Sequence, residues 1–354
     1  MRDILESTVV RLLADHSTPA LALACENGDW PAALWQAVAD SGFALAAAPE
    51  SRGGAGASWD ELYPVLVACG RHHAPVPLPE AIFANWLLGI AGIDALPGPL
   101  SFAVQATLTM EGGRVSGAMA EVPWGRHVDH VVAIASGEQP MLVLLPTAGA
   151  VNRRRSMNVA GEPRDGLDFD AVAAVASAPL PDGIAPSVMA CGGAMLRAAQ
   201  SAGALQRLLE LCTAHAGERV QFGKAIGSFQ AIGHQIAVLA EQVALTSVAA
   251  EAACAESGDA GLALLPIAAA KVCSAEAAGV AAAIAHAVHG AIGFTHEHVL
   301  HLTTRRLWAW RSEYGSMTDW AQRIGRAVCA GGASAFWPAI TAGSLPGLNP
   351  GAFR

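Results

Sequence analysis

Apolar residues recur at helical spacing over roughly the first 95 positions and again from about residue 187 to residue 331. Between these stretches, short apolar runs alternate with turn residues, a pattern typical of half-buried β-strands. The order helix, strand, helix predicts an α+β protein of several domains. We expect a helical domain at 1–98, a β domain at 99–185, a helical bundle at 186–335 and an irregular tail at 336–354.

The β domain is expected to begin after Leu96-Pro97-Gly98-Pro99, where two prolines and a glycine interrupt the helical pattern. Positions 102–108 alternate, and the runs 130–135 and 141–145 have the length and composition of short strands. The turn residues between these runs favour hairpins. We therefore expect a small antiparallel β unit.

Composition adds an expectation about assembly. Hydrophobic residues make up 53% of the chain and charged residues only 14%, so little charge is present to cover the outside of the molecule. Subunit interfaces are the usual way to bury such a surface, which predicts an oligomer. The net charge of −9 argues against a nucleic-acid partner, which requires a basic face.

The seven cysteines are scattered, odd in number and never spaced as C-x-x-C. This pattern favours reduced thiols and a cytoplasmic protein over a disulfide framework or a zinc site. The start of the chain has an early acidic residue and no long apolar core, so we expect no signal peptide. Lys271, Glu276 and His286 interrupt the apolar run 262–288, which favours a buried helix over a membrane span.

A polar turn with two glycines, Arg219 to Gln230, separates two long apolar helical patterns. Arg219 lies where the first pattern ends, and the backbone amides around Gly223 are free of a regular helix. A guanidinium beside exposed amides suits a pyrophosphate, because it donates two parallel charged hydrogen bonds. A solvated loop with ordinary turn glycines fits the same residues. The residues alone leave these two interpretations open.

For two other polar clusters, the sequence fits either an ordinary structural role or a ligand-binding role. His72-His73 could be a metal site, but no other ligand lies at helical spacing, which favours histidines at a helix end. Arg153-Arg154-Arg155 suits a solvated loop, with contact to a phosphorylated ligand as the alternative.

The stretch from Arg219 to Gln230 resembles the R-x-Q-F-G-x-x-I-x-x-F-Q signature of the acyl-CoA dehydrogenase family. Residues 34–56 resemble that family's N-terminal W-x-x-L-x-x-x-G and P-E-x-x-G-G-x-G segments, and residues 288–298 resemble its late H-G-x-x-G-F-T-x-E-H segment. All three segments occur in the family's order. The resemblance implies a helical N-terminal domain, a small β-barrel middle domain and a C-terminal four-helix bundle.

The resemblance also implies the chemistry: α,β-dehydrogenation of an acyl-CoA, with FAD as cofactor and an electron-transfer flavoprotein-type acceptor. A carboxylate removes the α proton while FAD accepts a hydride. One of the family's two positions for this base falls on Gly193, which has no side chain. At the other, Glu313 stands three residues before Ser316, as in the family's E-G-T-S turn. Glu313 is thus the candidate base; a solvated carboxylate near a helix start is the alternative.

The cofactor-binding candidates that the resemblance implies come from three parts of the chain. The R-x-Q-F-G segment supplies the first four, the late segment the next three and the β domain the last: Arg219, Gln221, Phe222, Gly223, His289, Gly290, Gly293 and Trp124. Glu297 matches a motif position as well, and we expect it to be structural or to contact the cofactor side.

Several departures from the family concern the side that holds the flavin ring. The middle domain lacks the T-E-P-x-x-G-S-D segment, and Glu121 and Pro123 stand where the family has the Trp and Thr beside the ring. Trp124 could stack on a flavin or belong to the β-domain core. Ala287 stands where the family has a Gln that approaches the adenine half of FAD. The arginine segment therefore keeps the family's residues, whereas the side that holds the flavin ring has lost several of them.

In this family the arginine segment reaches the FAD of a neighbouring subunit. Eroded chains of this length, with a run such as Arg305–Arg311, resemble subunits of heteromeric acyl-CoA dehydrogenases that act on steroid side-chain thioesters. Three hypotheses follow. The chain is an FAD-dependent acyl-CoA dehydrogenase or a subunit of a homo- or heterotetramer; a non-catalytic partner that completes a sister subunit's FAD site; or a flavin monooxygenase or oxidase on the same scaffold.

Overall fold

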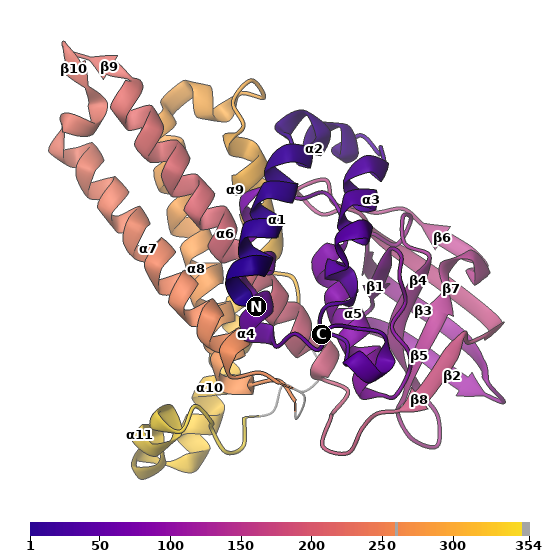
Figure 1. Ribbon diagram of the computed structural model, residues 1–354. Coiled ribbons are helices and arrows are strands. Elements are labelled where there is room, and N and C mark those ends of the chain that lie inside the picture. Colours follow the sequence, from indigo (N-terminus) through magenta and orange to yellow (C-terminus); the bar gives the residue numbers. More distant parts are fainter. Residues whose placement is uncertain (259–260, 349–354) are drawn as a thin grey trace.

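The computed structural model describes residues 1–258 and 261–348. A β-sheet lies on one side of the molecule, a group of N-terminal helices in the middle and a set of long C-terminal helices on the other side (Figure 1). The chain passes through these parts in the order that the hydrophobic pattern predicts.

The N-terminal part is helical, as expected. Its α4 begins at a reciprocal cap: the Ser58 hydroxyl accepts a hydrogen bond from the Glu61 amide at 3.3 Å, and the Glu61 carboxylate accepts one from the Ser58 amide at 3.0 Å. The predicted helix start at Ser58 is thus confirmed. The helices of this part are α1 (Arg2–His16), α2 (Pro19–Glu26), α3 (Ala32–Ser41), α4 (Trp59–Arg71) and α5 (Leu78–Ile90).

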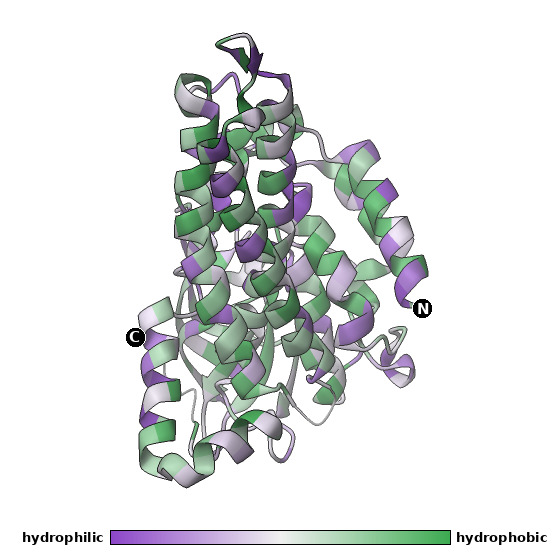
Figure 2. Cartoon of the chain, turned by 90° about the vertical axis from the view of Figure 1, so that its left-hand side faces the viewer, coloured by the Kyte–Doolittle hydropathy of each residue, from purple (hydrophilic) through white to green (hydrophobic). Residues whose placement is uncertain are grey.

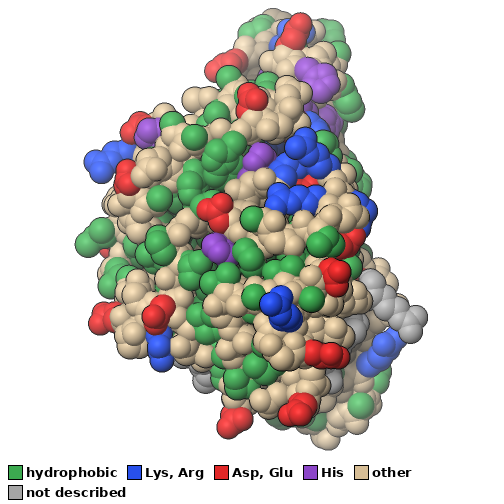
Figure 3. All heavy atoms as spheres, turned by 90° about the vertical axis from the view of Figure 1, so that its right-hand side faces the viewer, with side chains coloured by type: hydrophobic (Ala, Val, Ile, Leu, Met, Phe, Trp, Pro, Cys, Tyr) green, Lys and Arg blue, Asp and Glu red, His purple; other side chains and the backbone are tan. Residues whose placement is uncertain are grey.

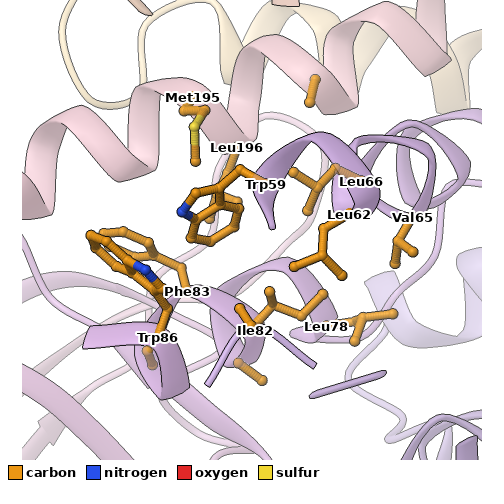
Figure 4. Packing of buried hydrophobic residues seen from close by; sticks show 14 of the residues in the cluster. Trp59, Leu62, Val65, Leu66, Leu78, Ile82, Phe83, Trp86, Met195 and Leu196 are labelled. Atoms are coloured by element: carbon orange, nitrogen blue, oxygen red, sulfur yellow. The ribbon is translucent and has the colours of Figure 1, made fainter. Parts of the chain in front are cut away.

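Aromatic side chains fill the space where α4, α5 and the long C-terminal helix α6 (Val188–Glu218) meet. Trp59 of α4 lies edge-on to Trp86 of α5, with ring centres 5.7 Å apart, and Leu196 of α6 closes the cluster from above (Figure 4). Helices α4 and α6 approach closely at Gly70, where an added Cβ would lie 1.9 Å from the Gln200 carbonyl oxygen. This contact fixes the N-terminal helices against the bundle.

The sheet has eight strands, and its pairing order runs β6-β7-β3-β2-β4-β5-β8, with β1 paired to β4. One of its faces is apolar and forms a separate core around Met119, Val131 and Phe169. The strands are β1 (Leu100–Phe102), β2 (Gln105–Glu111), β3 (Arg114–Pro123), β4 (His130–Ser136), β5 (Met141–Pro146), β6 (Asn152–Arg154), β7 (Arg164–Ala173) and β8 (Ala176–Pro179).

The expectation of a purely antiparallel unit is wrong for two strand pairs. Strands β1 and β2 both pair with β4 in parallel, whereas the remaining pairs are antiparallel. The segment between β3 and β4 carries the chain across the sheet before β4 begins, so β4 does not form a hairpin with β3. Hairpin turns alone do not specify such a crossing.

The C-terminal part consists of long helices that pack side by side. Helices α6, α7 and α8 contact one another, α9 packs against α6 and α8, and α10 packs against α8. A short hairpin of β9 (Val220–Gln221) and β10 (Lys224–Ala225) joins α6 to α7. The other elements are α7 (Gln230–Ala255), α8 (Leu264–His289), α9 (Leu300–Trp310), α10 (Met317–Gly331) and α11 (Ala333–Thr341).

The expected irregular tail is wrong in part, because α11 covers residues 333–341 and contains Pro338. Ala339 of this helix is buried against Ala327 of α10, and this packing compensates for the backbone hydrogen bond that the proline cannot make. The last part of the predicted tail, residues 349–354, lies outside the described residues.

Within the described part of the chain, two helical stretches are long and apolar enough to cross a membrane by composition alone, α7 and 264–294; in their apolar 18-residue windows, 28% and 56% of the residues are buried. The second contains α8, which lies between α6, α7 and α9. The buried-helix interpretation therefore describes α8 well. Helix α7, in contrast, leaves three large apolar side chains exposed: Val238, Leu245 and Val248.

Candidate functional site

The β9–β10 hairpin projects from the end of the long helices, at the end of the molecule farthest from the sheet (Figure 1). Arg219 and Gln221 are exposed, and Phe222 at the tip is 94% exposed. The chain turns at Phe222 and Gly223, both in the left-handed region with φ of 53° and 80°. Among the described residues, no protein group covers the tip. We call residues 219–223 the arm.

The arm lies far from the cavity that this chain itself offers for a ligand. Glu313 lines that cavity and forms an ion pair with Arg197 of α6. Arg219 lies at the other end of this helix, as its C-terminal cap. A helix rises about 1.5 Å per residue, so the Cα atoms of Arg197 and Arg219 are roughly 33 Å apart. The two predicted halves of the site therefore lie apart within one chain.

The cavity lies between the β domain and the turn that joins α9 to α10, and its volume is about 480 Å³. Glu121 and Pro123 of β3 line one wall, and Trp308, Glu313 and Tyr314 line the other. Glu313, the candidate base, is thus one of the residues that line this cavity.

Four hydrogen bonds hold the Glu313 carboxylate. Its Oε1 accepts from Arg164 Nε and Asn158 Nδ2, each at 2.9 Å, and its Oε2 accepts from Arg197 Nε at 2.7 Å and Arg164 Nη2 at 3.0 Å. Burial alone raises the pKa of Glu313, but Arg164 and Arg197 outweigh burial and lower the pKa to about 2.

This environment argues against Glu313 as the catalytic base. A general base needs a pKa near the working pH and a free lone pair toward the substrate proton. Glu313 has its carboxylate oxygens committed to two guanidinium groups, and its pKa of about 2 makes it a weak proton acceptor. In this structure Glu313 is a partly buried ion-pair partner of Arg164 and Arg197, and its role as the base stays a prediction.

The family's other base position is closed by an aromatic ring. A Cβ added to Gly193 of α6 would lie 2.5 Å from the ring of Tyr314. Tyr314 reaches this place because its backbone is left-handed, with φ of 59°, and its ring stacks on Phe102 with centres 5.6 Å apart. No carboxylate can occupy this position without moving Tyr314.

The wall formed by β3 differs from a flavin-stacking surface. Trp124 is 5% exposed and lies in the apolar core of the sheet with Val122 and Val128. The core interpretation of Trp124 is thus correct, and its proposed stacking on a flavin is not. At the cavity itself, the exposed Glu121 carboxylate accepts a hydrogen bond from Gln105 at 2.9 Å.

The late segment has a structural role at two of its three candidate positions. His289 is buried, and its Nδ1 donates to the Ala285 carbonyl at 2.8 Å. Gly293 is buried beside it, since an added Cβ would lie 2.8 Å from the His289 Cβ. In this structure His289 and Gly293 pack against each other, and their contact with a cofactor stays a prediction. Gly290 lines a shallow apolar groove with Ala287, and Glu297 is exposed.

Arg164 and Arg197 are the site residues that sequence reasoning missed. A signal existed for Arg197, which is the only charged residue in the apolar stretch from Val188 to Leu205. A charge in such a stretch requires a buried partner. No comparable signal marks Arg164, which lies at the start of β7 in an ordinary polar turn.

The paired histidines and the arginine run of the β domain are held by hydrogen bonds and an ion pair within the chain. His73 shares a hydrogen bond of 2.7 Å with Thr303, and Arg153 donates to the Thr147 carbonyl at 2.5 Å. Arg154 pairs with Asp168. Within residues 1–258 and 261–348, no three His, Cys, Asp or Glu side chains gather in a way that could hold a metal ion.

Comparison with known proteins finds relatives of this chain in one enzyme family. The model of the acyl-CoA dehydrogenase C-terminal domain matches residues 192–317. The acyl-CoA dehydrogenase IpdE2 of Mycobacterium tuberculosis is 32% identical over 323 residues, covering 86% of this chain and 90% of the relative. The acyl-CoA dehydrogenase FadE27 of the same organism is 30% identical over 337 residues, covering 83% of this chain and 87% of the relative.

Solved structures agree in fold. One chain of the ChsE4–ChsE5 complex of M. tuberculosis matches with a TM-score of 0.78 and 23% identity, covering 93% of this chain and 97% of that chain. A Tcur3481–Tcur3483 steroid ACAD variant matches with a TM-score of 0.81 and 24% identity, covering 93% and 98%. The predicted α+β fold is thus confirmed. Its fold and its sequence identity to curated relatives together identify the chain as a member of the acyl-CoA dehydrogenase family, whose enzymes depend on FAD.

Proposed function

We propose that this chain is a subunit of a heteromeric acyl-CoA dehydrogenase and completes the FAD site of a sister subunit with its arm. The observation that carries this proposal is the position of the arm at the end of α6, whereas Glu313 of the chain's own cavity pairs with Arg197, which precedes Arg219 by roughly 33 Å along that helix. An arm so placed reaches only a cofactor held by another chain. The sister subunit then supplies the base and the flavin-stacking side chains.

The arm has the chemistry that the pyrophosphate of FAD requires. Arg219 offers a planar guanidinium, and the turn at Gly223 leaves backbone amides exposed beside it. When bound, FAD accepts the hydride that leaves the β carbon of the acyl thioester. The part that this chain's residues take is to hold and orient the pyrophosphate across the interface.

The chain's own cavity does not fit an FAD or an acyl-CoA well. Glu121, Asp319 and Glu313 bring three carboxylates to its lining, and Arg164 is the only Lys or Arg among the described lining residues. Arg164 already donates to Glu313, Glu162 and the Pro163 carbonyl, so little of its charge remains for a phosphate. Because FAD and CoA are anions, this lining disfavours them. The same lining weighs against a monooxygenase or oxidase, which also needs its own flavin.

Helix α7 supports an oligomer. Val248 of this helix is 68% exposed, and Leu245 and Val238 are exposed as well. Figure 2 shows the long helices from this side, with many hydrophobic positions along them. The same surface carries Glu241, which would be costly in lipid, so a protein partner is the better cover for this helix. The arm lies between the end of α6 and the start of α7, so one partner can cover α7 and receive the arm.

Relatives suggest the substrate and the partner. Two similar structures are named as two-protein complexes, ChsE4–ChsE5 and Tcur3481–Tcur3483, and the second is named a steroid ACAD. By analogy, we propose a bulky, steroid-type acyl-CoA as substrate, a heterotetramer as assembly and an electron-transfer flavoprotein-type acceptor. The free thiols support a cytoplasmic protein, and the net charge of −9 weighs against a nucleic-acid partner, although the face in Figure 3 carries a small group of basic side chains.

The test is the substitution Arg219→Ala in the assembled complex. Loss of the charged contacts should weaken FAD retention about 10-fold or more, measured as the FAD released during dialysis of the complex. Arg155→Ala, which removes an exposed arginine of the β domain, is the matched control and should retain FAD. Equal retention by both variants would contradict the role of the arm.

A further inference from the structure

A cluster of buried charged side chains joins the three parts of the chain beside the cavity. We call it the ion-pair cluster and define it by five residues: Glu80, Glu162, Arg164, Arg197 and Glu313. They come, in this order, from α5, the loop before β7, β7 itself, α6 and the turn between α9 and α10. The N-terminal helices, the β domain and the bundle each contribute at least one member.

The contacts within the ion-pair cluster join the bundle to each of the other two parts. Arg197 Nη2 lies 2.8 Å from Glu80, which links the bundle to the N-terminal helices. Arg164 Nη2 lies 2.8 Å from Glu313 and 2.9 Å from Glu162, which links the β domain to the bundle. The Trp310 indole of α9 also donates to Glu162 at 3.0 Å.

The charges nearly balance. Three carboxylates face two guanidinium groups within the ion-pair cluster, and two more buried cations lie next to it. Arg306 Nε is 3.6 Å from Glu162, and Lys271 Nζ donates to the Trp310 carbonyl at 2.5 Å. Burial lowers the pKa of Lys271 to about 7, and the neighbouring Glu313 opposes this shift. Charges so deeply buried are tolerated only while their partners stay in place.

We propose that the ion-pair cluster is an interdomain latch that holds the β domain and the N-terminal helices against the bundle without a cofactor. The cavity lies between two of these parts, the β domain and the bundle, so a flavin bound there would bridge those two. A subunit without a flavin of its own needs another link, and the ion-pair cluster provides it. In this sense the inference deepens the proposed function and rests on it.

The latch has a defined pH range. Glu313 and Glu162 both have a lowered pKa, because Arg164 outweighs the opposing effect of burial. A carboxylate with a lowered pKa contributes stability above its unfolded pKa of about 4.3, and this contribution is lost as the pH falls toward its folded value. The groups that face Glu313 are Arg164, Arg197 and Asn158, with Lys271 and Tyr314 close by. The latch should therefore stay closed at neutral pH.

The experiment uses the full chain purified without FAD, at pH 7.5, with Glu313→Gln as the variant. The amide keeps the shape and removes the charge, which leaves Arg164 and Arg197 buried without their shared partner. We expect the melting temperature to fall by about 5 °C or more. Glu121→Gln is the matched control, because Glu121 lines the same cavity outside the ion-pair cluster, and it should change the melting temperature by less than about 1 °C.

Limited proteolysis distinguishes opening of the latch from general destabilisation. The segment 180–187 joins the β domain to α6 and contains Leu180 and Ile184, both suited to thermolysin. Below the melting range, Glu313→Gln should speed cleavage in this segment about 10-fold, whereas Glu121→Gln should not. Glu313→Asp, which keeps the charge, should lie between Glu313→Gln and the wild type and remains usable if Glu313→Gln does not fold.

A double variant completes the test. If Arg164→Met and Glu313→Gln act on one latch, their combined loss of melting temperature should be smaller than the sum of the single losses. Additive losses, or a Glu313→Gln variant that behaves like Glu121→Gln, would overturn the proposal. Retention of FAD by the isolated chain would instead contradict the proposed function, so the two failures can be told apart.

Discussion

Glu313 and Gly193 occupy the two positions at which the family places its catalytic carboxylate. Motif spacing selects Glu313 as the candidate base, because spacing within a turn is local information, and the structure shows that Glu313 lines the cavity. Its protonation state depends on Arg197 and Arg164, which are 116 and 149 residues away in the sequence. No local pattern contains these contacts, so the sequence predicts the carboxylate but not its environment.

Gly193 offers a prediction at the same scale. Gly193→Ala should destabilise the chain by about 1–3 kcal/mol, because the new Cβ would lie 2.5 Å from the Tyr314 ring. Chemical denaturation of the isolated chain measures this change. Gly217→Ala, in the same helix but with no atom within 4 Å of its added Cβ, should stabilise the chain by about 0.5–1 kcal/mol. Equal effects at both positions would mean that Tyr314 does not fill the site.

At the scale of elements, the hydrophobic pattern predicts what its period can encode. It identifies the helical parts and the start of α4, because apolar spacing and caps are local. It fails for the parallel pairing of β4 and for α11, where Pro338 indicates a loop but packing of Ala339 on α10 maintains a helix. Both failures concern contacts between elements, which local rules do not contain.

Histidine rings lie against one another where α6 and α8 end, beside the arm. The rings of His215 at the end of α6 and His289 at the end of α8 have centres 4.5 Å apart, and His298 lies 4.7 Å from His289. Burial lowers the pKa of all three, and Arg219 lowers that of His215 further. The folded chain therefore favours their neutral forms, and the unfolded chain binds protons more readily.

The stability of this region should consequently fall as the pH drops below about 6.5, the ordinary pKa of histidine. We expect hydrogen exchange in residues 212–230, corrected for the intrinsic rate, to be several-fold faster at pH 5.5 than at pH 7.5. His289→Gln should remove part of this pH dependence, whereas His16→Gln on exposed α1 should leave it unchanged. Identical protection at both pH values would contradict the prediction.

At the scale of the whole molecule, the arm and the cavity lie at different places, and this arrangement determines the function that we propose. The sequence contains the arm motif and the substitutions at Glu121 and Pro123, so the amino-acid sequence alone reveals the asymmetry between an intact and an eroded side. The sequence does not reveal the distance between the arm and the cavity, because this distance depends on the length and straightness of α6. The structure adds the latch, which joins residues from four separate stretches of the chain.

The central claim is that this chain completes a sister subunit's FAD site and holds no FAD itself. The most direct measurement is the FAD content of the full chain purified alone, from its visible absorption and the FAD released on denaturation, compared with the complex formed with its sister subunit. We predict a colourless chain that stays colourless after incubation with FAD, and a yellow complex with fewer FAD molecules than chains. A yellow chain with about one FAD per monomer would contradict this account.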